Sequence, residues 1–327
     1  MKTVRMGAPA TEVPAAQRHR RLLRSGVWSA YLLALLVVTV LFGPPTQRIY
    51  QALWIVVGIA AFAPDRPWRD QVRILVDWVP LIAALVVYDH TRGIANTLGM
   101  PLRVREPVVV ERALFGGTVP TVWLQEQLDG DGGRPWWTVL TGLVYTSHFL
   151  VPWLLAAILY VLSRERWSKY MRRILLLSYL GLVTYVLLPA APPWYAARAG
   201  VIEAEIHRST GFGFRLYSVD IGADWLAAHS NPVAAIPSLH AGFALLVAIA
   251  LWPSAGHWWW RLPLAAFPVA MGFTLVYGGE HYVIDVLLGW VYVGLTIGLA
   301  TAWERRRAPA GTPPAPAVAA PGGDRGG

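Results

Sequence analysis

The sequence has no cysteine and few charged residues, and both absences narrow what the protein can be. Without cysteine there are no disulfides and no thiolate metal ligands. Asp, Glu, Lys and Arg make up 14% of the chain, against about 25% in typical soluble proteins. The apolar residues are gathered in long blocks, so the 327 residues do not read as soluble domains. The pattern predicts an all-α, polytopic membrane protein built as a helical bundle.

Lysine is also scarce, with two residues against 26 arginines, and the C-terminal tail is rich in Ala, Pro and Gly. This bias is associated with high-GC bacteria. The net charge of +9 would suggest nucleic acid in a soluble protein, but cytoplasmic loops rich in Arg account for it in a membrane protein. We therefore expect no nucleic-acid partner. The sequence lacks an Asp-rich CDP-alcohol motif with a DGxxAR core, which disfavours a metal-dependent transferase that uses CDP-lipids.

Eight apolar runs predict about eight transmembrane helices. They are Val27–Phe42, Ile49–Ala63, Val72–Tyr88, Trp136–Leu162, Ile174–Ala191, Ile236–Trp252, Leu262–Tyr277 and Tyr282–Trp303. The first competes with a signal peptide, but no clear cleavage site follows it. The second is short for a span of about 20 residues, so these two form either a tilted pair or a re-entrant hairpin. Basic residues 164–169 are interpreted as a turn.

The runs divide the chain into four parts. These are a basic cytoplasmic tail (1–25), an N-terminal transmembrane pair (26–71), a six-helix catalytic core (72–303) and a disordered cytoplasmic tail (304–327). Residues 89–135 form a polar connection, and within it Val108–Gln127 mixes apolar and polar positions, as in a segment on the membrane surface. Most Lys and Arg fall in the tails and in the turns after the second, fourth and sixth helices. The positive-inside rule therefore places both termini in the cytoplasm.

A histidine and an aspartate lie four residues apart where the last helix begins. Positions i and i+4 share a helix face, so Asp285 can accept a ring N–H from His281. A carboxylate in that place fixes the tautomer and leaves the other nitrogen a better nucleophile or base. Ionisable groups are rare beside hydrocarbon and usually functional. The alternative is a buried polar pair that only joins two helices.

A second histidine begins the sixth helix on the same side of the membrane. Ser238 suits the N-cap, and His240 falls in the first turn. Free N–H groups and the helix dipole favour an anion there, so Ser238 is a candidate substrate-binding residue. His240 and His281 are separated by one helix inward and one helix back, and we expect them to meet near the outer leaflet. We expect His281 to attack phosphorus and His240 to act as acid and base.

Two alternatives concern these polar residues. Two histidines and an aspartate are also metal ligands, but Asp285 one turn below His281 fits an orienting carboxylate at least as well. We assign no metal and no cofactor. His148, near the middle of its predicted helix, is interpreted as a buried histidine bonded to a neighbouring helix rather than as a site residue.

Three stretches resemble motifs of the phosphatidic acid phosphatase type 2 superfamily, and most closely its inositolphosphotransferase branch, which includes inositol phosphorylceramide synthases. They are Leu188–Tyr195, Pro237–Gly242 and His281–Asp285. Each is weak alone, but their order, spacing and topology together are a strong signal, and the resemblance covers roughly residues 72–303. It implies that His240 is the acid and base, that His281 is the nucleophile through a phosphohistidine, and that Asp285 orients His281.

The chain departs from the phosphatase branch ahead of the third motif. That branch has a Ser-Arg pair where this sequence has Thr274 and Leu275, and the synthase branch lacks the arginine too. The departure favours transfer over hydrolysis and leaves the cation that holds the phosphate unidentified. Arg92 is the first candidate for it and Arg198 the second. Either can instead be an arginine that only faces headgroups.

The expected function is that of a membrane lipid phosphotransferase. It would pass a phosphoryl or headgroup-phosphoryl unit from a phospholipid or polyprenyl phosphate to an acceptor at the extracytoplasmic face of the plasma membrane. The first alternative is a lipid or polyprenyl phosphate phosphatase with water as the acceptor. The second is a non-enzymatic lipid transporter or binder whose histidines relay protons.

Overall fold

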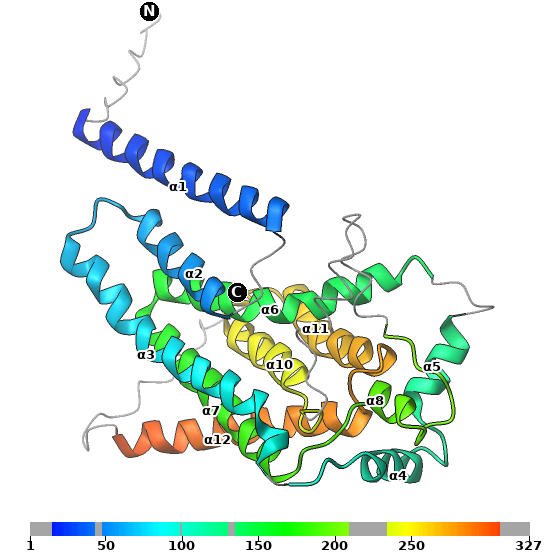
Figure 1. Ribbon diagram of the computed structural model, residues 1–327. Coiled ribbons are helices and arrows are strands. Elements are labelled where there is room, and N and C mark those ends of the chain that lie inside the picture. Colours follow the sequence, from blue (N-terminus) through cyan, green and yellow to red (C-terminus); the bar gives the residue numbers. More distant parts are fainter. Residues whose placement is uncertain (1–14, 43–47, 99, 130–134, 209–233, 308–327) are drawn as a thin grey trace, which may run out of the picture.

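The computed structural model describes residues 15–42, 48–98, 100–129, 135–208 and 234–307, which form eleven α-helices. These are α1 (Ala15–Phe42), α2 (Arg48–Phe62), α3 (Trp68–Gly93), α4 (Arg105–Leu114), α5 (Pro120–Leu128), α6 (Thr138–Leu162), α7 (Arg164–Leu187), α8 (Pro193–Arg198), α10 (Leu239–Leu251), α11 (Trp258–Tyr277) and α12 (Val283–Arg307). Figure 1 shows their arrangement. Each of the eight predicted apolar runs corresponds to one helix. The expected tail residues 1–14 and 308–327 lie outside the described residues.

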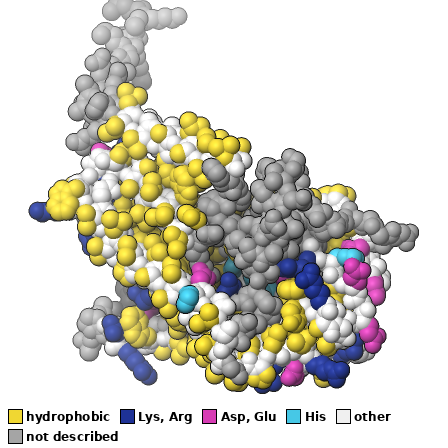
Figure 2. Space-filling model, viewed as in Figure 1, with side chains coloured by type: hydrophobic (Ala, Val, Ile, Leu, Met, Phe, Trp, Pro, Cys, Tyr) yellow, Lys and Arg dark blue, Asp and Glu magenta, His cyan; other side chains and the backbone are white. Residues whose placement is uncertain are grey.

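Six of these helices are long and apolar enough to cross a membrane. They are α1, α3, α6, α7, α11 and α12, while α2 and α10 are shorter apolar helices. Large apolar side chains point outward along them, as expected of a surface that faces lipid. Figure 2 shows a broad hydrophobic surface over α1, α2 and α3, with charged side chains and histidines gathered away from it. The chain is thus a polytopic helical membrane protein, as predicted.

Helix α10 lies at the centre of the bundle, packed against α6, α7, α11 and α12. Its sequence is apolar on every side, which is typical of a helix with no lipid-facing surface. Phe243, Leu246 and Val247 join the main hydrophobic core with residues of α3 and α7. The first turn of α10 is therefore held by packing on all sides, which is the place where Ser238 and His240 lie.

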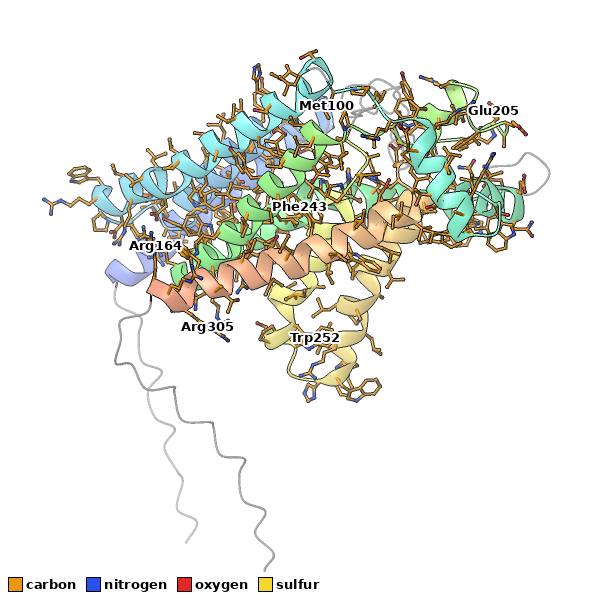
Figure 3. All side chains as sticks on the ribbon, turned by 90° about the horizontal axis from the view of Figure 1, so that it is seen from below. Met100, Arg164, Glu205, Phe243, Trp252 and Arg305 are labelled. Carbon is orange, nitrogen blue, oxygen red and sulfur yellow. The ribbon has the colours of Figure 1, made fainter. Side chains whose placement is uncertain are left out.

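The connections at one end of the long helices are tied to one another. Arg103 donates its backbone N–H to Pro189 and accepts one from Ala191, both at 2.9 Å, and Ala235 donates to Ala190 at 3.2 Å. Helices α4, α5 and α8 lie at this same end (Figure 1). Figure 3 shows Met100 and Glu205 here, while Arg164 and Arg305 lie at the opposite end of the long helices.

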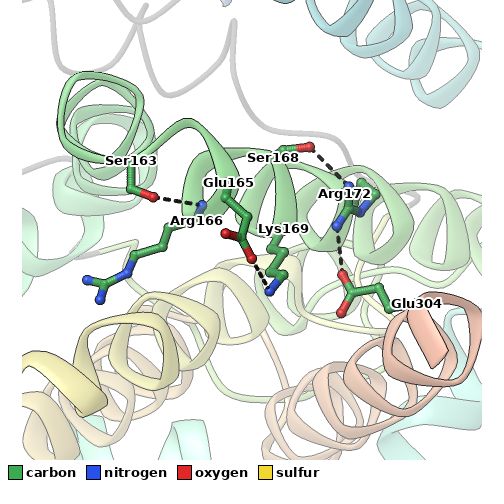
Figure 4. A network of polar contacts seen from close by, with 7 residues as sticks. All are labelled: Ser163, Glu165, Arg166, Ser168, Lys169, Arg172 and Glu304. Carbon is green, nitrogen blue, oxygen red and sulfur yellow. Dashed lines mark hydrogen bonds and ion pairs between the residues drawn. The ribbon is translucent and has the colours of Figure 1, made fainter. Parts of the chain in front are cut away.

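Two helices, α1 and α7, begin ten or more residues earlier than the apolar runs suggest. Helix α1 includes Ala15 and the basic residues that follow, so part of the expected tail is helical. The predicted turn at residues 164–169 is wrong, because these residues form the first turns of α7. The Ser163 side chain caps this helix by accepting the Arg166 N–H at 3.4 Å, and Glu165 pairs with Lys169 at 2.7 Å (Figure 4). Arg, Glu and Lys are good helix formers, so a helix of such residues continues beyond the apolar span.

Candidate active site

The first turn of α10 is fixed by two hydrogen bonds. Ser238 is the N-cap, and its hydroxyl accepts the Ala241 N–H at 3.3 Å. The Tyr185 hydroxyl of α7 donates to the Pro237 carbonyl at 2.7 Å. Both contacts are buried, so the backbone that carries His240 is set by α7 as well as by its own cap.

His281 and Asp285 lie together at the start of α12. The His281 Nδ1 is 3.4 Å from the Asp285 Oδ2, and the same carboxylate oxygen accepts the Tyr282 backbone N–H at 2.9 Å. Asp285 is fully buried and His281 nearly so. The carboxylate thus fixes the loop before the helix and contacts the imidazole, which leaves Nε2 as the ring nitrogen away from Asp285.

Two glycines bring α10 and α12 close together. The Ser238 N–H donates to the Asp285 carbonyl at 2.9 Å, and a Cβ on Gly289 would collide with the Ser238 carbonyl. A Cβ on Gly242 would lie 3.4 Å from the Gly289 carbonyl. Only a residue without a side chain allows this approach at Gly289. As a result the ring centroids of His240 and His281 are 5.6 Å apart, with the rings inclined by 59°.

Helix α6 supplies three side chains around His240 that the sequence interpretation did not assign to the site. The Tyr145 ring stacks on His240 at 5.2 Å, the Phe149 ring meets it edge-on at 5.9 Å, and the His148 centroid is 4.0 Å away. His148 also stacks on Phe243 at 5.4 Å. It contacts a neighbouring helix as expected, but its partner is a histidine of the candidate site. The spacing of 145, 148 and 149 marks one helix face, and that was the available signal.

The two arginines named as phosphate partners lie in different places. Arg92, near the end of α3, is half-buried and lies over the Tyr88 ring at 6.0 Å. Arg198, at the end of α8, is exposed and lies over the Trp194 ring at 5.5 Å. Arg92 is therefore partly enclosed by the bundle, whereas Arg198 is at the surface.

A third arginine beside the histidines was not predicted. Arg208 forms two parallel hydrogen bonds to Glu280, each 2.9 Å long, and lies 4.5 Å over the Trp194 ring. Glu280 directly precedes His281, so the ion pair lies next to the candidate site in the chain. Arg208 stands in a long polar connection without a motif, so no pattern in the sequence pointed to it.

Gln125 of α5 holds the backbone next to Arg208. Its carbonyl oxygen accepts the His207 N–H at 3.0 Å, and its amide group donates to the His207 and Tyr277 carbonyls at 2.8 and 2.6 Å. One buried side chain thus joins the connection to the end of α11. The arginine is placed by its own salt bridge and by this anchor.

Glu111 of α4 is fully buried and caps α12 from outside. One carboxylate oxygen accepts the Val283 N–H at 2.8 Å. Burial raises the pKa of Glu111 above its ordinary value, and hydrogen bonds from the N–H groups of Val283 and Ile284 oppose that shift. The surface helix α4 therefore stabilises the helix start at which His281 and Asp285 lie.

His240, His281 and Asp285 are residue types that also ligate metal ions. Within the described residues, no group of three or more His, Asp or Glu side chains is arranged to hold a metal ion. The histidines contact aromatic rings, and Asp285 contacts His281 and the Tyr282 N–H. An imidazole held by a carboxylate in this way can accept and donate a proton.

Comparison with known proteins gives a family and a relative. Residues 109–299 match the PAP2 superfamily. The chain is 28% identical over 267 residues to a protein of Bacteroides thetaiotaomicron named phosphoinositol dihydroceramide synthase, and the match covers 79% of this chain and 84% of that protein. No solved structure matches the chain.

Proposed function

This chain belongs to the PAP2 superfamily, which matches more than half of it, and from that premise we propose that it is a membrane lipid phosphotransferase with His281 as the nucleophile. One observation carries the proposal. Two histidines from separate helices lie with their ring centroids 5.6 Å apart, and a buried aspartate lies 3.4 Å behind one of them. A nucleophile, its orienting carboxylate and an acid are the groups that a two-step transfer through a covalent intermediate needs.

The first step breaks the bond between phosphorus and the leaving lipid alcohol. The His281 Nε2 attacks phosphorus, because Nδ1 faces Asp285, and His240 gives its proton to the departing oxygen. The phosphoryl or headgroup-phosphoryl unit then rests on His281. In the second step His240 takes the proton of an acceptor hydroxyl, whose oxygen attacks phosphorus, and the bond to His281 breaks. Each residue ends in the protonation state in which it began.

Phosphate oxygens need cations and N–H donors while charge develops on them. Arg208 bonds to Glu280, which directly precedes His281, and Arg92 is half-buried near the end of α3. We assign the phosphate to these two rather than to the exposed Arg198, together with the first turn of α10 that Ser238 caps. Arg208 would exchange part of its bonding to Glu280 for the phosphate.

The relative's name suggests the substrate class. We infer that the transferred unit is a phosphorylated polyol headgroup, of the phosphoinositol type, and that the acceptor is a lipid alcohol of the ceramide type. The lack of arginine at position 275 supports transfer over hydrolysis, as in the branch that the motifs resemble. A polyprenyl phosphate as donor and water as acceptor are the competing possibilities.

The proposed orientation places the site at the extracytoplasmic face of the plasma membrane. Arg164 and Arg305 lie at the end of the long helices opposite Met100 and Glu205 (Figure 3). By the positive-inside rule the arginine-rich end is cytoplasmic. The histidines begin α10 and α12 at the other end, where the outer leaflet supplies the lipid.

A single assay distinguishes the candidate functions. Purified protein in vesicles would receive phosphatidylinositol or polyprenyl phosphate labelled at phosphorus, with and without ceramide or diacylglycerol, beside the variants H281Q and H257Q. His257 is exposed and starts α11 away from the site, so H257Q is the matched control. We expect a new labelled lipid only with an acceptor, and no product from H281Q.

Other results would overturn parts of the proposal. Release of water-soluble label without an acceptor would show a phosphatase. Equal turnover by wild type and H281Q would refute the histidine mechanism. Lipid exchange without any broken phosphorus bond would show a transporter or binder.

A further inference from the structure

A cavity of about 530 Å³ lies between α1, α2 and α6. Its walls are almost entirely apolar and include Trp28, Tyr31 and Leu35 of α1 and Trp153 and Ala157 of α6. Its size falls within the range of about 300–1,000 Å³ that is typical of small-molecule sites. Helices α1 and α2 lie outside the residues that match the family, so the N-terminal pair adds this cavity to the catalytic core.

The polar groups of the wall bond to the protein rather than to the cavity. The Tyr31 hydroxyl donates to the Trp54 carbonyl at 2.9 Å, and the Gln51 side chain donates to the Phe149 carbonyl at 2.6 Å. These bonds join α1 to α2 and α2 to α6. Tyr31 packs so closely on α2 that a Cβ on Gly58 would lie 2.7 Å from its hydroxyl. The remaining lining suits an apolar guest.

The cavity lies beside the candidate active site. Phe149 lines the cavity and also meets the His240 ring at 5.9 Å, so this side chain borders both. From Phe149 the cavity follows α6 to Leu162, which at the rise of an α-helix is a length of about 20 Å. The direction is that of a lipid chain whose polar end lies at His240.

From the shared Phe149 and the direction of the cavity along α6 we propose that the cavity holds one alkyl chain of the lipid alcohol that exchanges its proton with His240. The proposal rests on the proposed function, since His240 acts there on the leaving alcohol and then on the acceptor. Both alcohols occupy the same position in turn, so one cavity serves both. Selectivity for chain length then comes from α1 and α2, because a chain that fits the cavity packs against their side chains. A chain in the bilayer is already out of water, so the hydrophobic effect gives no preference.

The test narrows the cavity and varies the lipid chain. Variant A157W places a ring into the cavity from α6, and L35W does so from α1. Variant L143W adds the same ring on α6 at an exposed residue that does not line the cavity. Transfer is measured to a ceramide with a short acyl chain and to one with a long acyl chain. We expect A157W and L35W to raise KM for the long-chain acceptor by about tenfold, with the short-chain rate and L143W unchanged.

The outcomes separate this inference from the proposed function. A wild type that transfers to neither acceptor refutes the function. A wild type that transfers to both, with variants that lose both rates equally or neither, refutes the chain site.

A second measurement needs no turnover. A photoreactive long-chain ceramide should label cavity residues of α6 in the wild type and not in A157W. Equal labelling of both proteins, or labelling of the Leu143 face instead, would show bulk bilayer lipid only and would overturn the proposal.

Discussion

The two ends of the long helices differ in how deeply their charged side chains are buried. At the Arg164 end, Glu165 pairs with Lys169 at 2.7 Å while its side chain is 76% exposed, and Arg172 joins Ser168 to Glu304 of α12 (Figure 4). At the histidine end, Glu280 pairs with Arg208 while its side chain is 8% exposed, and Asp285 is fully buried. Similar residue types are thus mostly exposed or half-exposed at one end, apart from Asp77 beneath Arg164, and lie inside the protein at the other.

The difference indicates what each end is for. Exposed ion pairs contribute about 0–1 kcal/mol to stability, so the Arg164 end serves mainly to hold charge at a membrane surface. Buried pairs cost free energy to assemble and are strongly disturbed when one partner is removed. Such a cost is retained where fixed charge stabilises a reaction. Substitutions should therefore have large effects at the histidine end and small effects at the other.

The largest effect is expected at His281. Variant H281Q removes the nucleophile, while Asp285 keeps its bond to the Tyr282 N–H. We expect turnover to fall by roughly 10³-fold or more, as for loss of a covalent nucleophile. Initial rates of labelled transfer measure it, and retention of the wild-type melting temperature shows that the fold survives. Activity within tenfold of wild type would remove His281 from the mechanism.

Loss of the Arg208 charge should have the next largest effect. We expect R208Q to lower kcat/KM by about 10²-fold, the cost of one donor to a developing anion, and R208K to restore part of it because lysine keeps the charge without the paired donors. Variant R198Q removes a charge over the same Trp194 ring at the surface and should leave kcat/KM within a factor of about three.

A structural role for Arg208 would give a different pattern. Variant R208Q leaves Glu280 buried and unpaired, so the double variant R208Q/E280Q removes that cost. Full recovery of activity in the double variant would show that Arg208 only neutralises Glu280. Continued loss of activity in a stable double variant supports contact with phosphate.

Glu111 should have an intermediate effect, through the stability of the α12 start. Variant E111L leaves the Val283 N–H without its acceptor, and we expect it to lower the free energy of unfolding by about 1–2 kcal/mol. Variant E111Q keeps an acceptor oxygen and should lose less. Thermal unfolding in detergent measures both. Equal melting temperatures for wild type and E111L would show that the cap contributes nothing.

Glu111 should also make the stability of the protein depend on pH. Burial raises the pKa of Glu111 in the folded protein, so the folded state binds this proton more tightly than the unfolded chain does. Its contribution to stability is therefore full below the ordinary glutamate pKa and is lost as pH rises through the folded pKa. The stability of wild type relative to E111Q should fall across that window. A difference that rises or stays flat with pH would contradict this environment for Glu111.

The smallest effect is expected at the Arg164 end. Variant E304Q removes the Arg172 partner, an ion pair of 2.8 Å whose side chains are 37% and 22% exposed. We expect a change in unfolding free energy of less than about 1 kcal/mol and no change in transfer rate. A loss of activity comparable to that of R208Q would show that the two ends do not differ in the way described.

Much of the fold followed from the sequence because lipid imposes simple rules. Apolar runs located eight of the eleven described helices, and the i, i+4 spacing placed Asp285 behind His281. Helices α10 and α12 begin at the same end because α11 runs back between them, and this path brought His240 to the depth of His281. The helix start at Arg164 was missed because hydropathy marks where the bilayer ends, whereas Ser163 and the pair of Glu165 and Lys169 continue the helix in water.

The rest of the site depends on tertiary packing that no local pattern encodes. Arg208 pairs with Glu280, next to His281, where Gln125 holds the neighbouring His207 against the end of α11. Glu111 caps a helix that begins 172 residues further along the chain. The distance between the histidines is set by Gly289, which lets the Ser238 carbonyl approach. Only the face formed by Tyr145, His148 and Phe149 carried a readable spacing.

The central claim, that a phosphoryl unit passes through His281, has a direct test. Wild type, H281Q and H257Q would be mixed with a donor lipid labelled at phosphorus, without acceptor, and quenched in alkali, which preserves phosphohistidine. Peptide mass spectrometry would then locate the label. We expect it on His281 in wild type and H257Q, chased into lipid when acceptor is added, and absent from H281Q. Turnover by wild type without a labelled histidine, or label on another residue, would contradict the account.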